Sequence, residues 1–149
     1  MNFGSSFGIS ASALTAQRLR MDVISSNIAN AETTRASVVD GKAVPYRRKM
    51  VVLEATPRSK FSDILNSTLN GSSNKGVRVQ AITEDSSPLK PVYNPSHPDA
   101  DNNGYVYMPN VDITKEMVDM LSASRSYEAN VTMLNASKAM VSKALEIGR

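Results

Sequence analysis

Apolar residues recur every seven positions near the start of the chain, with polar residues between them. A seven-residue repeat is typical of a helix that packs along another helix. Gly4 and Gly8 lower the helix propensity of the first turn. The pattern predicts a helix over residues 9–30 with a frayed start. The apolar residues at seven-residue spacing are Phe7, Leu14, Met21 and Ile28, and Ile24 and Ala31 lie on the adjoining row.

A second seam occupies the C-terminal third of the chain. Asp112 is a candidate N-cap, Glu116 lies near the positive end of the helix dipole, and Gly148 follows as a stop signal. These features predict a helix over residues 113–147, roughly 50 Å long. A chain of this size cannot bury a helix of that length within its own fold, which indicates a coiled coil or a helical assembly. The seam positions are Ile113, Met117, Met120, Ser124, Tyr127, Val131, Leu134, Lys138, Val141 and Leu145.

Between the two helices the period changes, and Gly and Pro residues interrupt the chain. Residues 46–55 and 76–85 are rich in Val and Ile and predict strands, with a third, short strand at 104–109. Residues 56–75 predict a long loop with a single helical turn at 61–65. The stretch SPLKPVYNPSHP is rich in proline and predicts a stiff, extended connector rather than a strand.

These elements predict an α+β fold in which long N- and C-terminal helices pair as an antiparallel coiled coil. The expected segments are 1–34 for the N-terminal helix, 35–110 for an extended arm, a small β-rich insertion and the Pro-rich connector, and 111–149 for the C-terminal helix. The C-terminal helix is longer than its partner by about two turns or more. Its unmatched seam would be exposed in a monomer, which favours coverage by a partner.

The composition suits helix packing better than a deep aromatic pocket. The chain has 149 residues, of which 41% are hydrophobic and 5% aromatic, with eight Met and no Trp. Cys is absent, so neither a disulfide nor a thiolate metal site is possible. No cleavable secretory signal and no apolar run of about 18 residues is present. We therefore expect any export to use a route that removes no signal.

The net charge of +3 is mildly basic, and residues 42–60 hold the one local excess of Lys and Arg. One hypothesis is a basic adaptor that binds nucleic acid or an anionic surface through this segment. Only Tyr46 is interleaved for base stacking, which favours a solvated or subunit-facing surface instead. Steep weakening of binding with salt would distinguish the adaptor.

Candidate catalytic groups are sparse. His97 is the only histidine, and it lies with Asp99 and Asp101 in a Pro-rich turn. A metal loop, or an enzyme that uses His97, is one interpretation; aspartates that accept backbone N–H bonds and shape the turn are the favoured one. No nucleotide-binding motif is present. We expect no catalytic residue, no cofactor and no metal site.

The stretch SSNIANAETTR, residues 25–35, holds more small polar residues than a helix end requires. Asn27, Asn30, Thr33 and Thr34 indicate a contact with something outside the chain; the alternative is that Asn30 only ends the helix. A similar choice applies to polar groups of the C-terminal helix, which form either an intersubunit hydrogen-bond set or an exposed face. They are Arg125, Tyr127, Glu128 and Asn130.

Three stretches together resemble the flagellar basal-body rod protein family. LTAQRLRMDVISSNIANAETT is similar to the N-terminal rod signature, in which a helix ends in Ser-x-Asn-[Ile/Leu]-Ala-Asn. YNPSHPDADNNGYVYMPNVDITKEM resembles the connector of the proximal rod subunit, and MLSASRSYEANVTMLNASKAM resembles the C-terminal helix motif of the axial proteins. RASVVDGKAV departs from the family pattern, because it separates the signature from Pro45, Tyr46, Arg47 and Arg48.

The resemblance implies a non-enzymatic subunit that is exported unfolded through the flagellar type III apparatus and polymerises into the periplasmic rod. Its partners would be itself, other rod proteins, neighbouring basal-body components and the export apparatus, with no nucleic acid; another axial rod or hook-type subunit is the alternative. Non-closing contacts between identical subunits generate helical filaments. The expected interface residues are Leu14, Met21, Ile24, Asn27, Ile28, Asn30, Met117, Met120, Arg125, Tyr127, Asn130, Val131, Leu134, Val141 and Leu145.

Overall fold

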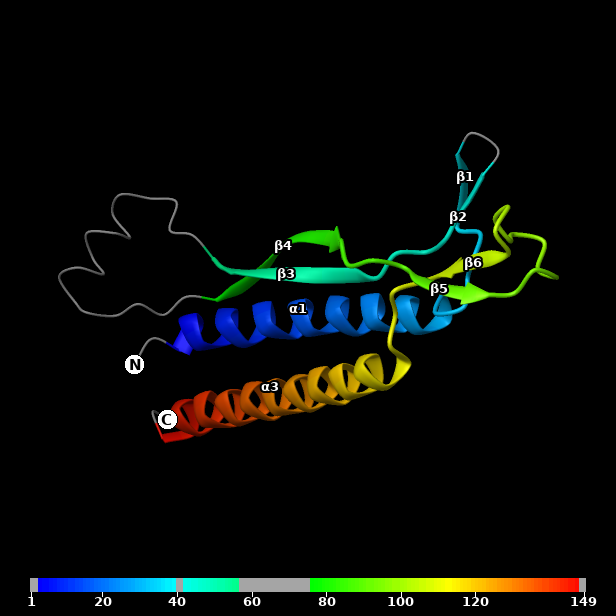
Figure 1. The fold of residues 1–149 in the computed structure, drawn as a ribbon. Coiled ribbons are helices and arrows are strands. Elements are labelled where there is room, and N and C mark those ends of the chain that lie inside the picture. Colours follow the sequence, from blue (N-terminus) through cyan, green and yellow to red (C-terminus); the bar gives the residue numbers. More distant parts are fainter. Residues whose placement is uncertain (1–2, 40–41, 57–75, 148–149) are drawn as a thin grey trace, which may run out of the picture. The chain divides into compact units, whose positions relative to one another are not determined.

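The computed structural model describes residues 3–39, 42–56 and 76–147, which form two long helices and three pairs of strands (Figure 1). The expected α+β class, with terminal helices and small strand pairs between them, is confirmed. The elements are α1 (Phe3–Ala29), β1 (Ser37–Val39), β2 (Lys42–Val44), β3 (Lys49–Ala55), β4 (Val77–Glu84), β5 (Lys90–Tyr93), β6 (Tyr105–Met108) and α3 (Ile113–Ile147).

Both predicted helices are present. Helix α1 begins at Phe3, earlier than expected, because a glycine lowers helix propensity by only about 1 kcal/mol and does not forbid the helical conformation. Helix α3 covers the predicted range, and Asp112 is its N-cap: Oδ1 accepts hydrogen bonds from the N–H groups of Thr114 at 3.0 Å and Lys115 at 3.4 Å. No helix in the described part of the chain is long and apolar enough to cross a membrane.

The three predicted strands are also found. They correspond to β3, β4 and β6, and the sheets pair β1 with β2, β3 with β4 and β5 with β6. Strands β1 and β2 form an antiparallel pair with Ser37 opposite Val44, inside the segment that departs from the rod pattern. The loop expected at 56–75, with its helical turn at 61–65, lies outside the described residues except for its first residue.

The Pro-rich stretch was expected to be a connector, and that prediction is wrong for Lys90–Tyr93, which form β5. Pro91 lies opposite Tyr107 in an antiparallel pair. Proline cannot donate a ladder hydrogen bond, but a strand with one partner has an open edge where no donor is needed. The two-stranded sheet therefore accepts a residue that a central strand would exclude.

The chain divides into two compact units, and each combines parts of both helices with part of the strand region. One contains residues 1–19, 52–81 and 123–149, and the other contains residues 20–51 and 82–122. The segment boundaries at 34/35 and 110/111 stay a prediction. In the second unit the buried apolar side chains are Val23, Ile24, Tyr46, Val106 and Val111.

The face of α3 that its own chain covers coincides only partly with the predicted seam. Glu116 and Ala123 are the most buried residues of the helix, with 0% and 1% exposure, and they lie one row beside that seam. On the seam itself, Met117 and Leu145 are 57% and 71% exposed. A small side chain such as Ala123 allows close approach of packed elements, so burial follows a row that the apolar pattern did not indicate.

Candidate functional site

Asn27, near the end of α1, is the centre of a buried hydrogen-bond network, with only 1% of its surface exposed. Its Nδ2 donates to the Lys49 carbonyl at 2.9 Å and to Glu116 Oε2 at 3.0 Å. Its Oδ1 accepts from the Lys49 N–H at 2.9 Å and from the Tyr46 hydroxyl at 3.0 Å. A carboxamide has two donor hydrogens and two acceptor lone pairs, so every hydrogen-bonding position of Asn27 is satisfied.

The second buried polar group is Glu116, in the first turn of α3. Its Oε1 accepts a 2.6 Å hydrogen bond from Arg48 Nε, across 68 positions of sequence. The Arg48 guanidinium also lies 3.6 Å from carboxylate oxygens of Asp85 and of Asp119. Since an unpaired buried charge is costly, these contacts explain how Glu116 can be fully buried. We call Asn27, Arg48, Asp85, Glu116 and Asp119 the polar cluster.

Charge within the polar cluster shifts the pKa of two of its groups. Burial acts to lower the pKa of Arg48, but the Glu116 hydrogen bond and charge, with Asp85 and Asp119, raise it above its ordinary value. Hydrogen bonds from Ser87, and then the charge of Arg48, hold the pKa of Asp85 below its usual range. Both pKa shifts favour the charged forms of Arg48 and Asp85.

Backbone contacts hold the cluster in place. Asn110 Oδ1 accepts from the Arg48 N–H at 2.9 Å, and the Arg48 carbonyl accepts from the Asp85 N–H at 2.7 Å. Asn110 Nδ2 in turn donates to the carbonyls of Asp85 and Ser87, each at 3.3 Å. Segments from three parts of the sequence are thus tied to the end of α1 and the start of α3.

The polar side chains of residues 25–35 form hydrogen bonds within the chain, and their contact with something outside it stays a prediction. Asn30 ends α1: its N–H and Nδ2 both donate to the Ser26 carbonyl, at 3.1 and 2.9 Å. The Thr33 carbonyl accepts from the Tyr46 N–H at 3.1 Å. Thr34 Oγ1 donates to Asp99 Oδ2 at 2.9 Å. Polar side chains in a short stretch cannot reveal partners that lie far along the chain.

The turn around His97 is organised by internal hydrogen bonds. His97 Nδ1 accepts from the Asp99 N–H at 3.1 Å, and Asp101 Oδ1 accepts from the Asn102 N–H at 2.8 Å. Hydrogen bonds from Arg35 and then Thr34 hold the pKa of Asp99 below its usual range. Asp101 shapes the turn as the favoured interpretation held, whereas the Asp99 carboxylate accepts from the side chains of Thr34 and Arg35. Within the described ranges no three His, Cys, Asp or Glu side chains gather as a metal site.

In the part of the basic segment that the structure describes, Arg48 and Tyr46 are engaged within the chain. Arg48 is committed to the acidic groups of the polar cluster. Tyr46 is only 8% exposed, and Lys49 Nζ lies 5.6 Å from the centroid of its ring. A buried ring is not free to stack on a base, so the structure does not favour the adaptor hypothesis.

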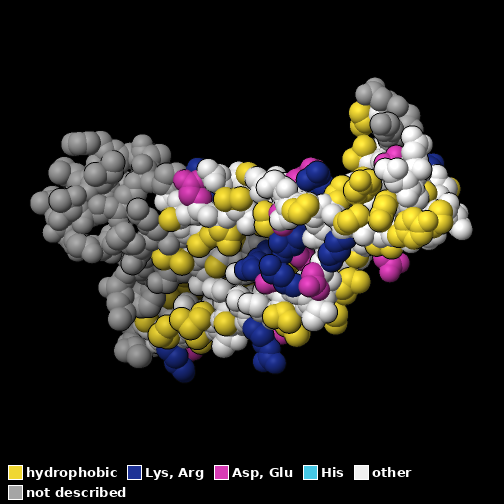
Figure 2. Space-filling model, viewed as in Figure 1, with side chains coloured by type: hydrophobic (Ala, Val, Ile, Leu, Met, Phe, Trp, Pro, Cys, Tyr) yellow, Lys and Arg dark blue, Asp and Glu magenta, His cyan; other side chains and the backbone are white. Residues whose placement is uncertain are grey.

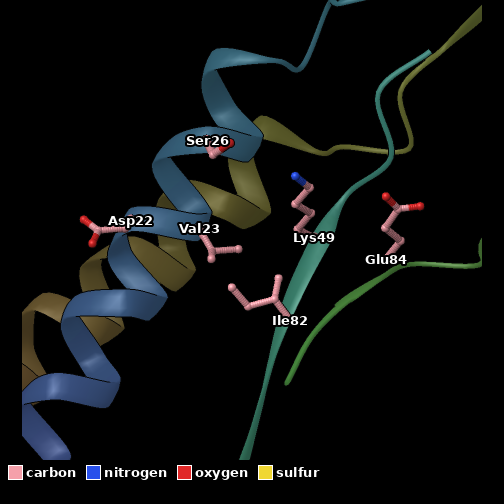
Figure 3. Close-up of a pocket in the computed structure, with 6 residues that line it drawn as sticks. All are labelled: Asp22, Val23, Ser26, Lys49, Ile82 and Glu84. Atoms are coloured by element: carbon pink, nitrogen blue, oxygen red, sulfur yellow. The ribbon is translucent and has the colours of Figure 1, made fainter. Parts of the chain in front are cut away.

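A pocket of about 440 Å³ lies next to Lys49, whose backbone Asn27 holds. Figure 3 shows Val23 and Ile82 directed toward each other in this pocket. An apolar pair with charged groups around it suits an amphipathic side chain. The lining residues are Asp22, Val23, Ser26, Lys49, Ile82 and Glu84.

The predicted interface residues differ in how far the chain itself covers them. Ile24 and Asn27 are buried, and Met117, Arg125 and Leu145 are exposed. The others are half-buried, and the role of the whole set in a subunit interface stays a prediction. The half-buried residues are Leu14, Met21, Ile28, Asn30, Met120, Tyr127, Asn130, Val131, Leu134 and Val141.

Sequence reasoning missed the polar cluster as a unit. Arg48 was counted in a basic run and Glu116 as a dipole partner, because their contact joins positions 68 residues apart. No pattern in the sequence singled out Asp85 or Asp119. The only local hint was Asn27 on an otherwise apolar face of its helix.

Comparison with known proteins identifies first the class and then the particular family. The family model "Flagella basal body rod protein" matches residues 7–36, and "Flagellar basal body rod FlgEFG protein C-terminal" matches residues 102–147. The chain is 61% identical to the flagellar basal-body rod protein FlgC of Bacillus subtilis, over 97% of both chains. FlgC of Borreliella burgdorferi is 46% identical over 99% of this chain and 98% of its own. FlgC of Salmonella typhimurium is 44% identical over 96% of both.

The chain therefore belongs to the FlgC family of flagellar basal-body rod proteins. It is a structural subunit of the basal-body rod of the bacterial flagellum and not an enzyme, as its relatives are rod proteins. The resemblance drawn from the three sequence stretches is confirmed. Both matched ranges contain residues of the polar cluster: Asn27 lies in the first, and Glu116 and Asp119 in the second.

Proposed function

We propose that this subunit polymerises into the proximal rod through its terminal helices, which pair as an antiparallel coiled coil within each copy. Two contacts support the direction of pairing. Asn27 bonds to Glu116, and Arg20 Nη2 lies 3.7 Å from Asp119 Oδ1. The partner numbers rise along α3 as they fall along α1, which is the order that antiparallel helices produce.

The remaining apolar surface of α3 supports polymerisation. Large apolar side chains are exposed along its length, among them Val118, Leu121, Met133 and Met140. A soluble monomer seldom leaves such a surface uncovered, and helical assembly covers it by repeating one heterologous contact. The interface residues named from the sequence would supply these contacts, with copies of this chain and with other rod proteins.

The polar cluster has a separate role in this proposal, which is to set the geometry within each subunit. Its hydrogen bonds are directional, and they join the end of α1 to the start of α3. Apolar packing alone would tolerate sliding by one turn, whereas a displaced Glu116 would lose both Arg48 and Asn27. A subunit that transmits torque along a helical tube benefits from such a fixed connection. Export through the type III apparatus would precede formation of the cluster, because the exported chain is unfolded.

Paired spin labels in isolated basal-body particles would test the antiparallel arrangement. The two contacts predict that position 18 lies near position 125 and position 8 near position 132. They predict that the pairs 8 with 115 and 18 with 139 are farther apart, by roughly 20–25 Å of helical rise. Short distances for the second two pairs would contradict the pairing. All six labelled positions are exposed in the chain: Gly8, Arg18, Lys115, Arg125, Thr132 and Ala139.

A further inference from the structure

The β5–β6 sheet presents an unusual aromatic surface. The register places Pro91 opposite Tyr107 and Tyr93 opposite Tyr105, so all four side chains share one face. The three tyrosines are 65%, 43% and 47% exposed, in the order 93, 105 and 107. They are three of the five tyrosines in the chain. We call these four residues the tyrosine face, and Figure 2 shows hydrophobic side chains gathered over β5 and β6.

The tyrosine face is preorganised. The rings of Tyr93 and Tyr105 meet edge to face, with centroids 5.4 Å apart. Gly104 has a φ of 77°, and a Cβ there would lie 3.0 Å from the Tyr93 ring, so glycine lets that ring lie across the turn. The other face of the sheet carries Val106, which is 3% exposed and anchors the pair of strands. The aromatic side chains are thus held in place without being covered.

Rigid, exposed tyrosines are characteristic of protein interfaces, where they contribute much of the binding free energy. The surrounding charge narrows the choice of partner. Residues 91–112 contain three Asp and no Lys or Arg. Asp99 is paired with Arg35, and Asp112 caps α3. Asp101 is exposed and lines a hollow together with Tyr107 and Arg35. A complementary partner would carry apolar groups next to a basic one.

Helix α3 carries such a surface on the side away from its covered row. Exposed residues at helical spacing form a stripe of basic and apolar groups without an acidic residue. Met133 and Met140 are 61% and 55% exposed and lie seven residues apart. Methionine makes favourable contacts with aromatic rings. We call this the outer stripe; it consists of Lys115, Val118, Arg125, Ala129, Met133, Ala136 and Met140.

We propose that the tyrosine face of one subunit docks against the outer stripe of α3 from a second copy of this chain. Met133 and Met140 contact the tyrosine rings, and Arg125 approaches Asp101. The two surfaces are different, so the contact is heterologous and can repeat along a filament. The inference rests on the proposed polymerisation and adds a specific pair of surfaces to it.

Site-specific photocrosslinking in assembled basal bodies tests the proposal. A benzophenone amino acid replaces Tyr107, and irradiation is followed by peptide mass spectrometry. The expected product is a covalent dimer of this chain in which position 107 is joined to residues 126–143 of the second copy. The matched control places the same group at Ile82, which is 48% exposed against 47% for Tyr107, and should not give that product.

Charge reversal tests the pairing of Arg125 with Asp101 through the yield of the photocrosslinked dimer. Arg125→Glu should lower the yield of the dimer several-fold, and Asp101→Arg in the same chain should restore it, because opposite charges then face each other again. A crosslink to another protein, to another part of this chain, or to nothing would overturn the proposal if the variant is present in the particles. Tyr105 replaces Tyr107 as the labelled position if the first variant is not incorporated. Failure of both labelled variants and of Tyr107→Phe to enter particles would instead count against the proposed polymerisation.

Discussion

The first third of α3 contains two almost wholly buried residues, whereas the described residues that follow contain none. Near the beginning, Glu116 and Ala123 are almost wholly buried. From Ser124 to Glu146, every residue is half-buried or exposed, and Met133, Met140 and Leu145 are more than half exposed. The helix continues through both regions without a break.

This difference separates two tasks that one helix performs. At its beginning, Glu116 fixes the helix to its own chain through hydrogen bonds from Asn27 Nδ2 and Arg48 Nε. Farther along, exposed apolar groups are suited to contacts with other chains. A structural subunit needs both, because a polymer transmits force only if each copy is internally rigid and its outer surfaces can bind neighbours.

The largest effect is expected from Leu134→Asp, in the sparsely covered half of α3. Truncation of a packed leucine costs about 2–5 kcal/mol even as alanine, and the aspartate must in addition be desolvated. Because the loss recurs in every copy, we expect the variant to be exported but not incorporated into basal bodies. Co-purification with isolated particles measures this.

Lys138→Ala is the matched control, since Lys138 is exposed and its stem can remain along the surface. It should assemble normally. Because Leu134 is half-buried in its own chain, circular dichroism of the exported monomer should accompany the assay. Normal incorporation of Leu134→Asp would contradict the role of this helix in polymerisation.

The second largest effect is expected from a substitution of Glu116, a buried residue at the beginning of α3. Glu116→Ala removes the carboxylate that holds Arg48 Nε and Asn27 Nδ2. Breaking a buried ion pair from one side typically costs about 3–5 kcal/mol. We expect the midpoint of urea unfolding to fall accordingly, while Glu128→Ala, at an exposed position of the same helix, should change little. Equal effects of the two substitutions would show that the polar cluster does not set the stability.

A smaller effect compares two glycines. Gly104→Ala forces a side chain into a left-handed conformation and against the Tyr93 ring, which should destabilise the chain by about 1–2 kcal/mol. Gly8 in α1 has open space around its Cβ position, so Gly8→Ala should stabilise the helix by about 0.5–1 kcal/mol. Thermal unfolding of the two variants should shift in opposite directions. A shift of the same sign would contradict one of the two assignments.

The smallest effect concerns pH. The pKa of Asp99 is lowered by its hydrogen bonds from Arg35 and Thr34, so its contribution to stability is present above the unfolded value of about 3.9. That contribution should be lost as the pH falls through the lowered folded value. Unfolding midpoints measured from pH 6 downwards, in steps of about one unit, should decline more steeply for the natural chain than for Asp99→Asn. Identical slopes would indicate that the Arg35 contact is not formed in solution.

Patterns among neighbouring residues were sufficient to predict much of the secondary structure. The seven-residue repeats located both helices, Asp112 marked the start of α3, and Val-rich segments located β3, β4 and β6. The strand at Lys90–Tyr93 was missed, because proline argues against a strand until the open edge of a two-stranded sheet is known. The family could also be recognised from short stretches, since the motif residues are close together in the sequence.

Helix caps and hydrophobic periodicity act over a few neighbouring residues, so the sequence alone was enough to locate both helices and the strands β3, β4 and β6. The tertiary structure decided which polar residues are buried. Arg48 and Glu116 look like ordinary surface residues in the sequence, and the polar atoms of Asn27, Arg48 and Glu116 are satisfied by contacts across 19 to 89 positions. The tyrosine face likewise depends on the register of β5 and β6, which places residues from two strands on one side. Such arrangements are decided by long-range pairing, because no local rule records which distant donor will meet which acceptor.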